Sequence, residues 1–258
     1  MNAPDTKIGV TLYNLRDYCK TEDDLARTLA RVRDIGYQVV QISGIGPIEP
    51  AAVKKRLDEN ELYCCATHEK LDQLKNDMES VVEKLKTWEC DFTAIGSAGN
   101  DYWSADGVVT LAGELDEIGA KLREQGIKFG FHNHHREFEH YTDKPFIQEL
   151  FDRTSPENLG FELDLHWVQR GGGNPVTWIK KAAGRLHVAH FKDYTILNHE
   201  PVFCEVGEGN LEWGPIIDAC ESVGCRWFVF EQDKPFGDRD IFESIKITYD
   251  NLKAMGVK

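Results

Sequence analysis

The stretch IKFGFHNHHREFE, from Ile127 to Glu139, begins as a strand and ends in a dense run of polar side chains. Three histidines and two glutamates fall within its last eight residues. Because successive strand side chains point to opposite faces, Gly130, His132 and His134 are predicted to share one face. No folding requirement explains such a cluster, so we interpret the stretch as a strand whose carboxyl end forms a site.

Three other strand-like runs also become polar at their carboxyl ends. They are LGFELDLH (Leu159 to His166), RLHVAHFKD (Arg185 to Asp193) and WFVFEQD (Trp227 to Asp233). In the LGFELDLH run, the period of two places Glu162, Asp164 and His166 on one face. Four apolar strands of this chain are therefore predicted to end in polar side chains.

Strand and helix patterns alternate along the whole chain. Strands are predicted at 8–12, 37–42, 62–66 and 91–95, from 127, 159 and 186 onward, and at 227–230, with the helices between them including 21–36, 50–60, 71–88, 175–183, 211–223 and 238–255. Eight such pairs in 258 residues predict an α/β fold, a single (β/α)8 TIM barrel spanning 1–258 as one domain. An open doubly wound sheet is the alternative, but the loop after Leu12 lacks the glycines of its phosphate loop.

Composition narrows the class of partner. The net charge of −14 and the pI near 5.1 disfavour a nucleic-acid backbone or an anionic membrane surface. Seven cysteines without a CxxC pair fit reduced thiols in a cytoplasmic protein. The start of the chain lacks an apolar signal core, and no apolar run approaches the roughly 20 residues of a membrane span. We expect a soluble protein that acts on small molecules.

The polar strand ends suggest a metal site. In a barrel the carboxyl ends of the strands surround one pocket. Strand phase brings Asp164, His190 and Glu231 inward, together with His132 or His134. Mixed nitrogen and oxygen donors suit one divalent ion, with Mn, Co, Zn, Fe and Mg as the candidates. A metal-free network of ion pairs is the alternative, because the two carboxylates need a cation or strong donors in a barrel mouth.

Further side chains are candidates for contact with a substrate. Arg16 and Lys192 offer fixed positive charges at the mouth, and His68 stands alone after the third strand. His187 is in the outward phase of its strand, which favours a structural role. Trp103 and Trp167 fit either a sugar face or a subunit interface, so a homo-oligomer stays open.

The runs FHNHHREF, FELDLHW, HFKD, VGEGNLEW and FEQD, with the opening GVTLYNLRD, resemble the xylose isomerase-like barrel superfamily, in particular its sugar phosphate isomerase/epimerase-type members. The resemblance covers nearly the whole chain in order. It implies a metal-dependent barrel that acts on sugars, keto-sugars or inositol derivatives, with Glu, Asp, His and Glu as ligands on strands five to eight. Asp164, His190 and Glu231 match three of these positions, and His132 stands where the family has its first carboxylate.

This match selects between the two histidines of the fifth strand. His132 and His134 lie about 6 to 7 Å apart along one face, so both cannot bind at the same height. The family position predicts His132 as the ligand. We expect His134 one layer higher, in contact with a substrate oxygen or in proton transfer.

The resemblance also bears on the reaction. Ketose epimerases of the superfamily use two metal-bound glutamates as an acid/base pair, and this chain retains only Glu231 of that pair. The remaining catalytic candidates are His134, Lys192 and Glu137, and the candidates for substrate binding are Arg16, His68, His166 and Trp167.

The predicted function is a metal-dependent sugar or keto-sugar isomerase/epimerase that removes a proton next to a carbonyl and forms an enediolate stabilised by the ion. The first alternative is a keto-sugar or inosose dehydratase, or a 3-keto-glycoside lyase, on the same site. An abasic-site endonuclease-like barrel is disfavoured by the acidic charge, and a non-catalytic sugar-binding barrel is a further alternative. The substrate and the choice between isomerisation, epimerisation and elimination stay open.

Overall fold

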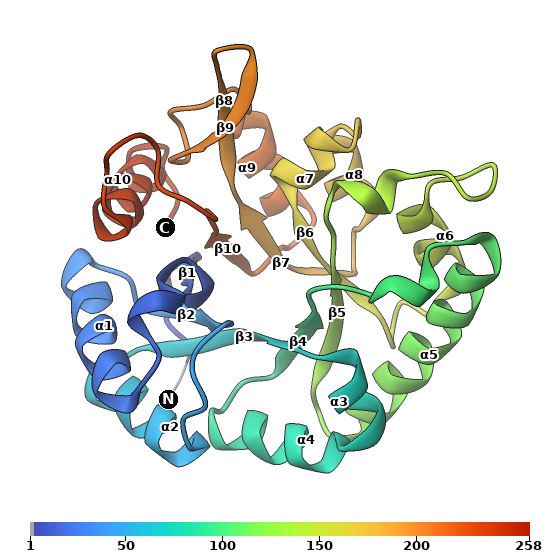
Figure 1. The fold of residues 1–258 in the computed structure, drawn as a ribbon, viewed down its shortest axis with the longest axis horizontal. Coiled ribbons are helices and arrows are strands. Elements are labelled where there is room, and N and C mark those ends of the chain that lie inside the picture. The colour runs from blue at the N-terminus through green and yellow to red at the C-terminus, as the bar shows by residue number, and fades with distance from the viewer. Residues whose placement is uncertain (1–2) are drawn as a thin grey trace.

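A closed barrel of eight parallel strands forms the centre of the computed structural model, which describes residues 3–258 (Figure 1). Around the barrel the order is β1, β10, β7, β6, β5, β4, β3 and β2. Their bounds are β1 (Ile8–Thr11), β2 (Val39–Ile42), β3 (Tyr63–Glu69), β4 (Phe92–Ile95), β5 (Lys128–His132), β6 (Gly160–Asp164), β7 (Leu186–Phe191) and β10 (Trp227–Phe230). The predicted (β/α)8 barrel is confirmed.

Helices surround the barrel in Figure 1. They are α1 (Glu22–Ile35), α2 (Pro50–Glu59), α3 (Leu71–Asn76), α4 (Met78–Thr87), α5 (Ala105–Glu124), α6 (Phe146–Arg153), α7 (Leu165–Arg170), α8 (Pro175–Lys181), α9 (Trp213–Ser222) and α10 (Ile241–Ala254), with 3-10 helices η1 (Leu12–Tyr18), η2 (Asn100–Tyr102) and η3 (His135–Phe138). Helix α1 begins where the sequence supplies a cap, because Thr21 at its N-cap and Asp24 form a reciprocal capping box.

The apolar core has two layers. The larger layer lies between the barrel and the helices and includes Phe161 and Leu163 of β6, as strand phase predicts, and Leu165 at the start of α7. The smaller layer fills the barrel and consists of Val39, Cys65, Ala66, Phe92, Ala94, Val188, Trp227 and Val229. This inner layer includes the first residues of β2, β4 and β10, so it lies toward the amino ends of the strands. The carboxyl ends are therefore left for polar groups.

Three predicted boundaries are corrected. Strand β3 continues to Glu69, so His68 lies on the strand rather than after it. The single helix predicted at 71–88 is two helices, because Asp77 leaves the helical conformation at φ −150°. Strand β6 ends at Asp164, whose side chain caps the next helix, so His166 lies in α7 and not on the strand.

The sequence predicts 198–203 only as a loop that shapes the pocket, whereas in the structure this segment belongs to an antiparallel hairpin. Its strands are β8 (Asp193–Leu197) and β9 (Glu200–Cys204), and they form a two-stranded sheet outside the barrel order. Asn198 and His199 both have positive φ values, of 51° and 68°, at the two-residue turn. The hairpin follows β7 directly, which places it beside the site.

All seven cysteines are buried and carry free thiols. Among residues 3–258, the structure contains no helix that is both long and apolar enough to span a membrane.

Candidate metal and substrate site

Four side chains from four neighbouring strands converge at the carboxyl end of the barrel. His132 ends β5, Asp164 ends β6, His190 lies on β7 and Glu231 directly follows β10. One ligand atom from each lies within 4.8 Å of the other three, and all four residues are buried. The pairing of Asp164 with His190 between β6 and β7 sets their common height. The structure thus brings together the predicted ligand set, and metal binding by this set stays a prediction.

Charge is concentrated at these four residues. His190 Nδ1 lies 3.1 Å from Glu231 Oε2. Burial opposes the charging of His190, but the carboxylates of Glu162 and Glu231 outweigh it and raise its pKa to about 9. Burial raises the pKa of Asp164 to about 7, despite the nearby ammonium of Lys192. The cluster therefore attracts positive charge strongly.

The side chains present fit a divalent ion. Asp164 Oδ2 and His190 Nδ1 are buried and make no hydrogen bond, and their nearest charged partners are Lys192 Nζ at 3.7 Å and Glu231 Oε2 at 3.1 Å. Such atoms destabilise a protein unless a donor or a cation compensates them. The set offers two imidazole nitrogens and two carboxylates, which is the donor chemistry of Mn, Co, Zn or Fe(II) sites.

Lys192 lies against the same carboxylates. Its Nζ is 3.0 Å from Glu231 Oε1, 3.7 Å from Asp164 Oδ2 and 2.5 Å from Asp233 Oδ2, and the residue is 1 % exposed. The ammonium also lies 4.9 Å from the ring centroid of Trp167 and 5.0 Å from that of Phe203. Burial disfavours its charge, but Glu231 and Asp164 outweigh this and raise its pKa. Lys192 therefore neutralises part of the acidic charge.

His134 lies outside the strand, because β5 ends at His132 and His134 is the N-cap of η3. Its ring centroid is 4.9 Å from that of His132 and 5.7 Å from that of Trp167. Burial and the neighbouring His132 lower its pKa to about 2, so the ring is neutral.

Glu137 is completely buried, and its Oε2 accepts a 2.8 Å hydrogen bond from the backbone N–H of His134. Burial raises its pKa. This contact supports a role in holding His134, and the catalytic role stays a prediction.

The predicted substrate contacts are distributed around the mouth. His68 Nδ1 lies 3.1 Å from Ser43 Oγ, and its ring centroid is 5.2 Å from that of His132. His166 is buried in α7, edge-on to Trp167 at 4.6 Å. Arg16 donates to the backbone oxygens of Tyr13 at 2.8 Å and Asp233 at 3.3 Å.

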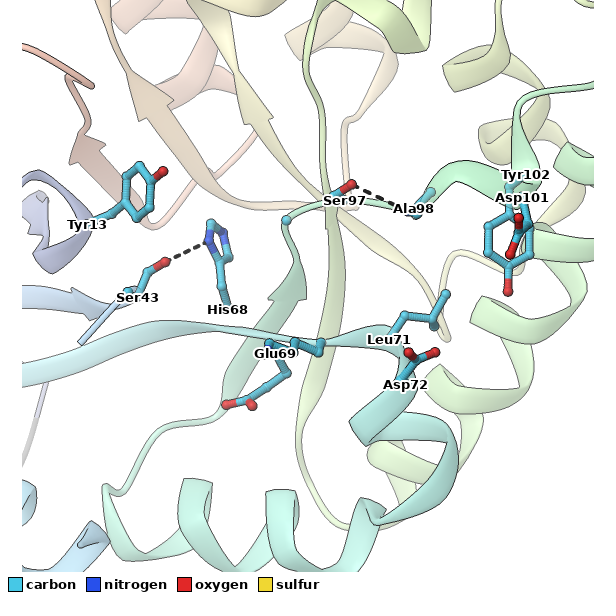
Figure 2. Close-up of a pocket in the computed structure, with 14 residues that line it drawn as sticks. Tyr13, Ser43, His68, Glu69, Leu71, Asp72, Ser97, Ala98, Asp101 and Tyr102 are labelled. Carbon is cyan, nitrogen blue, oxygen red and sulfur yellow. Dashed lines mark hydrogen bonds between the residues drawn. The ribbon is translucent and has the colours of Figure 1, made fainter. Parts of the chain in front are cut away.

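A cavity of about 580 Å³ opens beside His68. It is lined by the end of β3 and by the segments that follow β1, β2, β3 and β4, whereas the four clustered side chains come from the other half of the barrel. Figure 2 shows Ser43 directed at His68 on one side of this cavity, with Asp101 and Tyr102 on the opposite side. The site thus has a cluster half and a cavity half.

The sequence interpretation missed four residues of the site. Glu162 and Gln41 lie beneath the cluster, Asp233 pairs with Lys192, and Phe203 covers Lys192 from the hairpin. Strand phase already placed Glu162 inward, but it gave no sign of the histidines that meet it. The contact of Phe203 with Lys192 was not predicted, because 198–203 was expected only as a loop that shapes the pocket and not as part of a hairpin.

Comparison with known proteins identifies a family whose fold is the barrel described above. A family model described as a xylose isomerase-like TIM barrel matches residues 29–250. No match was found among curated proteins compared by sequence.

Solved structures share the fold. A sugar phosphate isomerase/epimerase from Parabacteroides distasonis has a TM-score of 0.85 at 20 % identity, covering 99 % of this chain and 96 % of that one. An L-ribulose 3-epimerase has a TM-score of 0.73 at 16 % identity, covering 97 % and 94 %. A probable 3-DHS dehydratase from Bacillus anthracis has a TM-score of 0.75 at 12 % identity, covering 96 % and 98 %. At these identities the similarity establishes the fold.

Proposed function

Because the chain belongs to the xylose isomerase-like TIM barrel family, we propose that it is a metal-dependent isomerase or epimerase of a sugar or keto-sugar. The observation that carries this proposal is the convergence of His132, Asp164, His190 and Glu231 within 4.8 Å at the carboxyl end of the barrel. Enzymes of this barrel architecture place their chemistry at that end. The similar folds of a sugar phosphate isomerase/epimerase and an L-ribulose 3-epimerase support the reaction class.

The proposed reaction removes a proton next to a carbonyl group. A divalent ion held by the four side chains would polarise adjacent substrate oxygens and make that proton more acidic. Glu231 is proposed to take the proton from one carbon and to return it to the product carbon, while the neutral ring of His134 donates its N–H to a substrate oxygen. Lys192, held between Asp164 and Glu231, would place a fixed positive charge beside the substrate oxygens.

The cavity half of the site is proposed to hold the rest of the sugar. Its wall carries the exposed carboxylates of Asp72 and Asp101, and Lys70 is the one lysine among its lining residues. Tyr13 and Tyr102 offer ring faces, which suit the apolar face of a sugar. This lining favours an uncharged sugar over a phosphorylated one. Free buried thiols support a reducing compartment such as the cytoplasm.

Elimination on the same site is the second candidate. One observation favours it: β5 ends in His132, so the cluster contains Glu231 as its one glutamate. A symmetric exchange between two glutamates is therefore not available. Proton removal followed by loss of a β-oxygen needs one base and one acid. Lys192 or His134 can serve as the acid.

The test is proton exchange in deuterated water. Purified protein is loaded with Mn²⁺, Co²⁺ or Zn²⁺ and incubated with a panel of keto-sugars and keto-glycosides, and NMR follows both C–H exchange and products. We expect metal-dependent exchange next to the carbonyl with at least one substrate. Asp164→Asn should abolish exchange, whereas His187→Gln, a half-buried histidine lower on β7, should retain it.

The products separate the two candidates. A rearranged or epimerised sugar supports the isomerase or epimerase, and an unsaturated sugar product with a released aglycone supports the lyase. Metal-independent exchange, or exchange that survives Asp164→Asn, would contradict both.

A further inference from the structure

Glu162 lies at the centre of a hydrogen-bonded layer directly beneath the cluster. It is completely buried on β6. Its Oε1 lies 2.5 Å from His68 Nε2, 3.1 Å from His190 Nε2 and 3.3 Å from His132 Nδ1. Its Oε2 accepts a 2.9 Å hydrogen bond from Gln41 Nε2. One carboxylate therefore contacts side chains from β2, β3, β5 and β7.

The barrel register explains this position. Glu162 is paired with His132 across β5 and β6, and it precedes Asp164 by two residues on the same face of β6. It therefore lies one layer deeper than Asp164, on the inner side of the proposed metal site. At this depth a carboxylate faces the rings of His132 and His190 from below.

The ring atoms of His190 show the consequence. Its Nε2 faces Glu162 and lies 2.6 Å from Gln41 Oε1, whereas its Nδ1 lies on the side of Glu231. When the ring is neutral and Nε2 donates its proton to Gln41 Oε1, beside the Glu162 carboxylate, Nδ1 presents a lone pair to the cluster. His132 has its Nδ1 towards Glu162, which leaves Nε2 as its donor atom for an ion.

We propose that Glu162 is a positioning residue of the metal site, which fixes the tautomer and ring orientation of His132 and His190 together, with Gln41 as its partner. The inference rests on the proposed function. The same carboxylate contacts His68, so it also anchors a histidine that lines the substrate cavity.

A second ion bound by Glu162 itself is the competing interpretation. His68, His132, Glu162 and His190 also form a compact group of candidate ligands. His132 and His190 belong to both groups, however. To bind two ions at once, each of these rings would have to be deprotonated at both nitrogens and bridge the two ions. A carboxylate that accepts N–H donors from ligand histidines needs no such step.

The test measures metal affinity rather than turnover. Co²⁺ is titrated into metal-free protein, with calorimetry for the dissociation constant and visible absorption for the ligand field. Glu162→Gln keeps the shape of the side chain and removes its charge. We expect one ion per chain, a dissociation constant roughly 10- to 100-fold higher and a shifted absorption band. Glu149→Gln, which alters a buried carboxylate on α6 paired with Arg153, should match the parent in both.

Two further variants keep the test decisive. If Glu162→Gln does not fold, Gln41→Met removes the second acceptor of His190 Nε2, and we expect a weaker affinity and the same direction of band shift. His68→Gln should leave Co²⁺ affinity at the parent value. Loss of Co²⁺ binding in both His68→Gln and Glu162→Gln would instead make Glu162 a ligand.

Parent-like affinity and spectrum in Glu162→Gln, or in Gln41→Met if that variant is the one that folds, would overturn this inference and leave the proposed function intact. A parent protein that binds no Co²⁺ would overturn both.

Discussion

His132 and His134 lie two residues apart but in different kinds of structure. His132 is the last residue of β5 and belongs to the cluster, whereas His134 caps η3 and faces His132 and Trp167. We therefore expect His132→Ala to weaken metal binding by on the order of 100-fold or more, because it removes a proposed donor. His134→Ala should keep the metal and lower kcat by roughly 10²- to 10⁴-fold.

Metal analysis after dialysis, combined with kcat of the reloaded proteins, distinguishes these roles. His187→Gln serves as the matched histidine control, with both values near those of the parent. The reverse pattern, in which His134→Ala loses metal and His132→Ala keeps it, would require the two roles to be exchanged.

Lys192 is the residue whose role is least obvious from its contacts. Its ammonium pairs with Glu231, Asp164 and Asp233, so it is either a partner of the substrate or a support for the ligands. We expect Lys192→Met to retain the metal, because removal of a neighbouring cation increases the attraction for an ion. Turnover should fall about tenfold or more. Metal content by atomic emission and kcat measure the two effects, and loss of metal in this variant would make Lys192 a structural partner instead.

At the residue scale, the sequence predicted the cluster better than its surroundings. Asp164, His190 and Glu231 were identified because each lies at or near the carboxyl end of a strand in the inward phase, and barrel geometry brings strand ends together. Strand phase left His132 and His134 open, and the family resemblance selected His132. The ring of contacts around Glu162 was not predictable in this way. It depends on which side chains meet across the barrel, and a single strand does not contain that information.

The loop between β9 and α9 is organised by one buried carboxylate. Asp193, the first residue of β8, accepts hydrogen bonds from the backbone N–H groups of Gly207, Gly209 and Leu211 and from Trp213 Nε1. The VGEGNLEW run therefore wraps around the residue that follows Lys192. A Cβ at Gly209 would lie only 2.2 Å from Asp193 Oδ1, which excludes a larger residue.

We therefore predict that Gly209→Ala lowers the free energy of unfolding by roughly 1 to 3 kcal/mol, because the loop must move away from Asp193. Gly214→Ala is the matched control, since nothing lies within 4 Å of the added Cβ and the position is in α9. It should leave stability unchanged or raise it by up to about 1 kcal/mol. Urea unfolding of the three proteins gives the comparison, and equal midpoints for Gly209→Ala and the parent would contradict the close contact.

Most differences between the sequence prediction and the structure occur at the ends of helices and strands. The helix break at Asp77 has no glycine or proline to mark it, so periodicity alone predicts one helix. The turn of the hairpin uses Asn198 and His199 at positive φ, and only the asparagine hints at such a conformation. The end of β6 was placed too late because LDLH continues the strand alternation, whereas Asp164 in fact caps α7.

At the scale of the whole molecule, the clustered ligand candidates and the cavity lie in different halves of the barrel. Strands β5, β6, β7 and β10 supply the clustered ligand candidates, and the segments after β1 to β4 line the cavity. His68 and Glu162 connect the halves through one short contact. The order of strands made the overall barrel predictable, because alternating strands and helices leave few other arrangements.

The central claim is that one divalent ion is held jointly by side chains from four strands, and metal titration of the parent and of Asp164→Ala tests it most directly. Calorimetry with Mn²⁺ or Co²⁺ should give one ion per chain for the parent. Asp164→Ala should show no saturable binding while its unfolding curve still reports a folded barrel. Full metal content and activity in Asp164→Ala would contradict the account and place the site elsewhere.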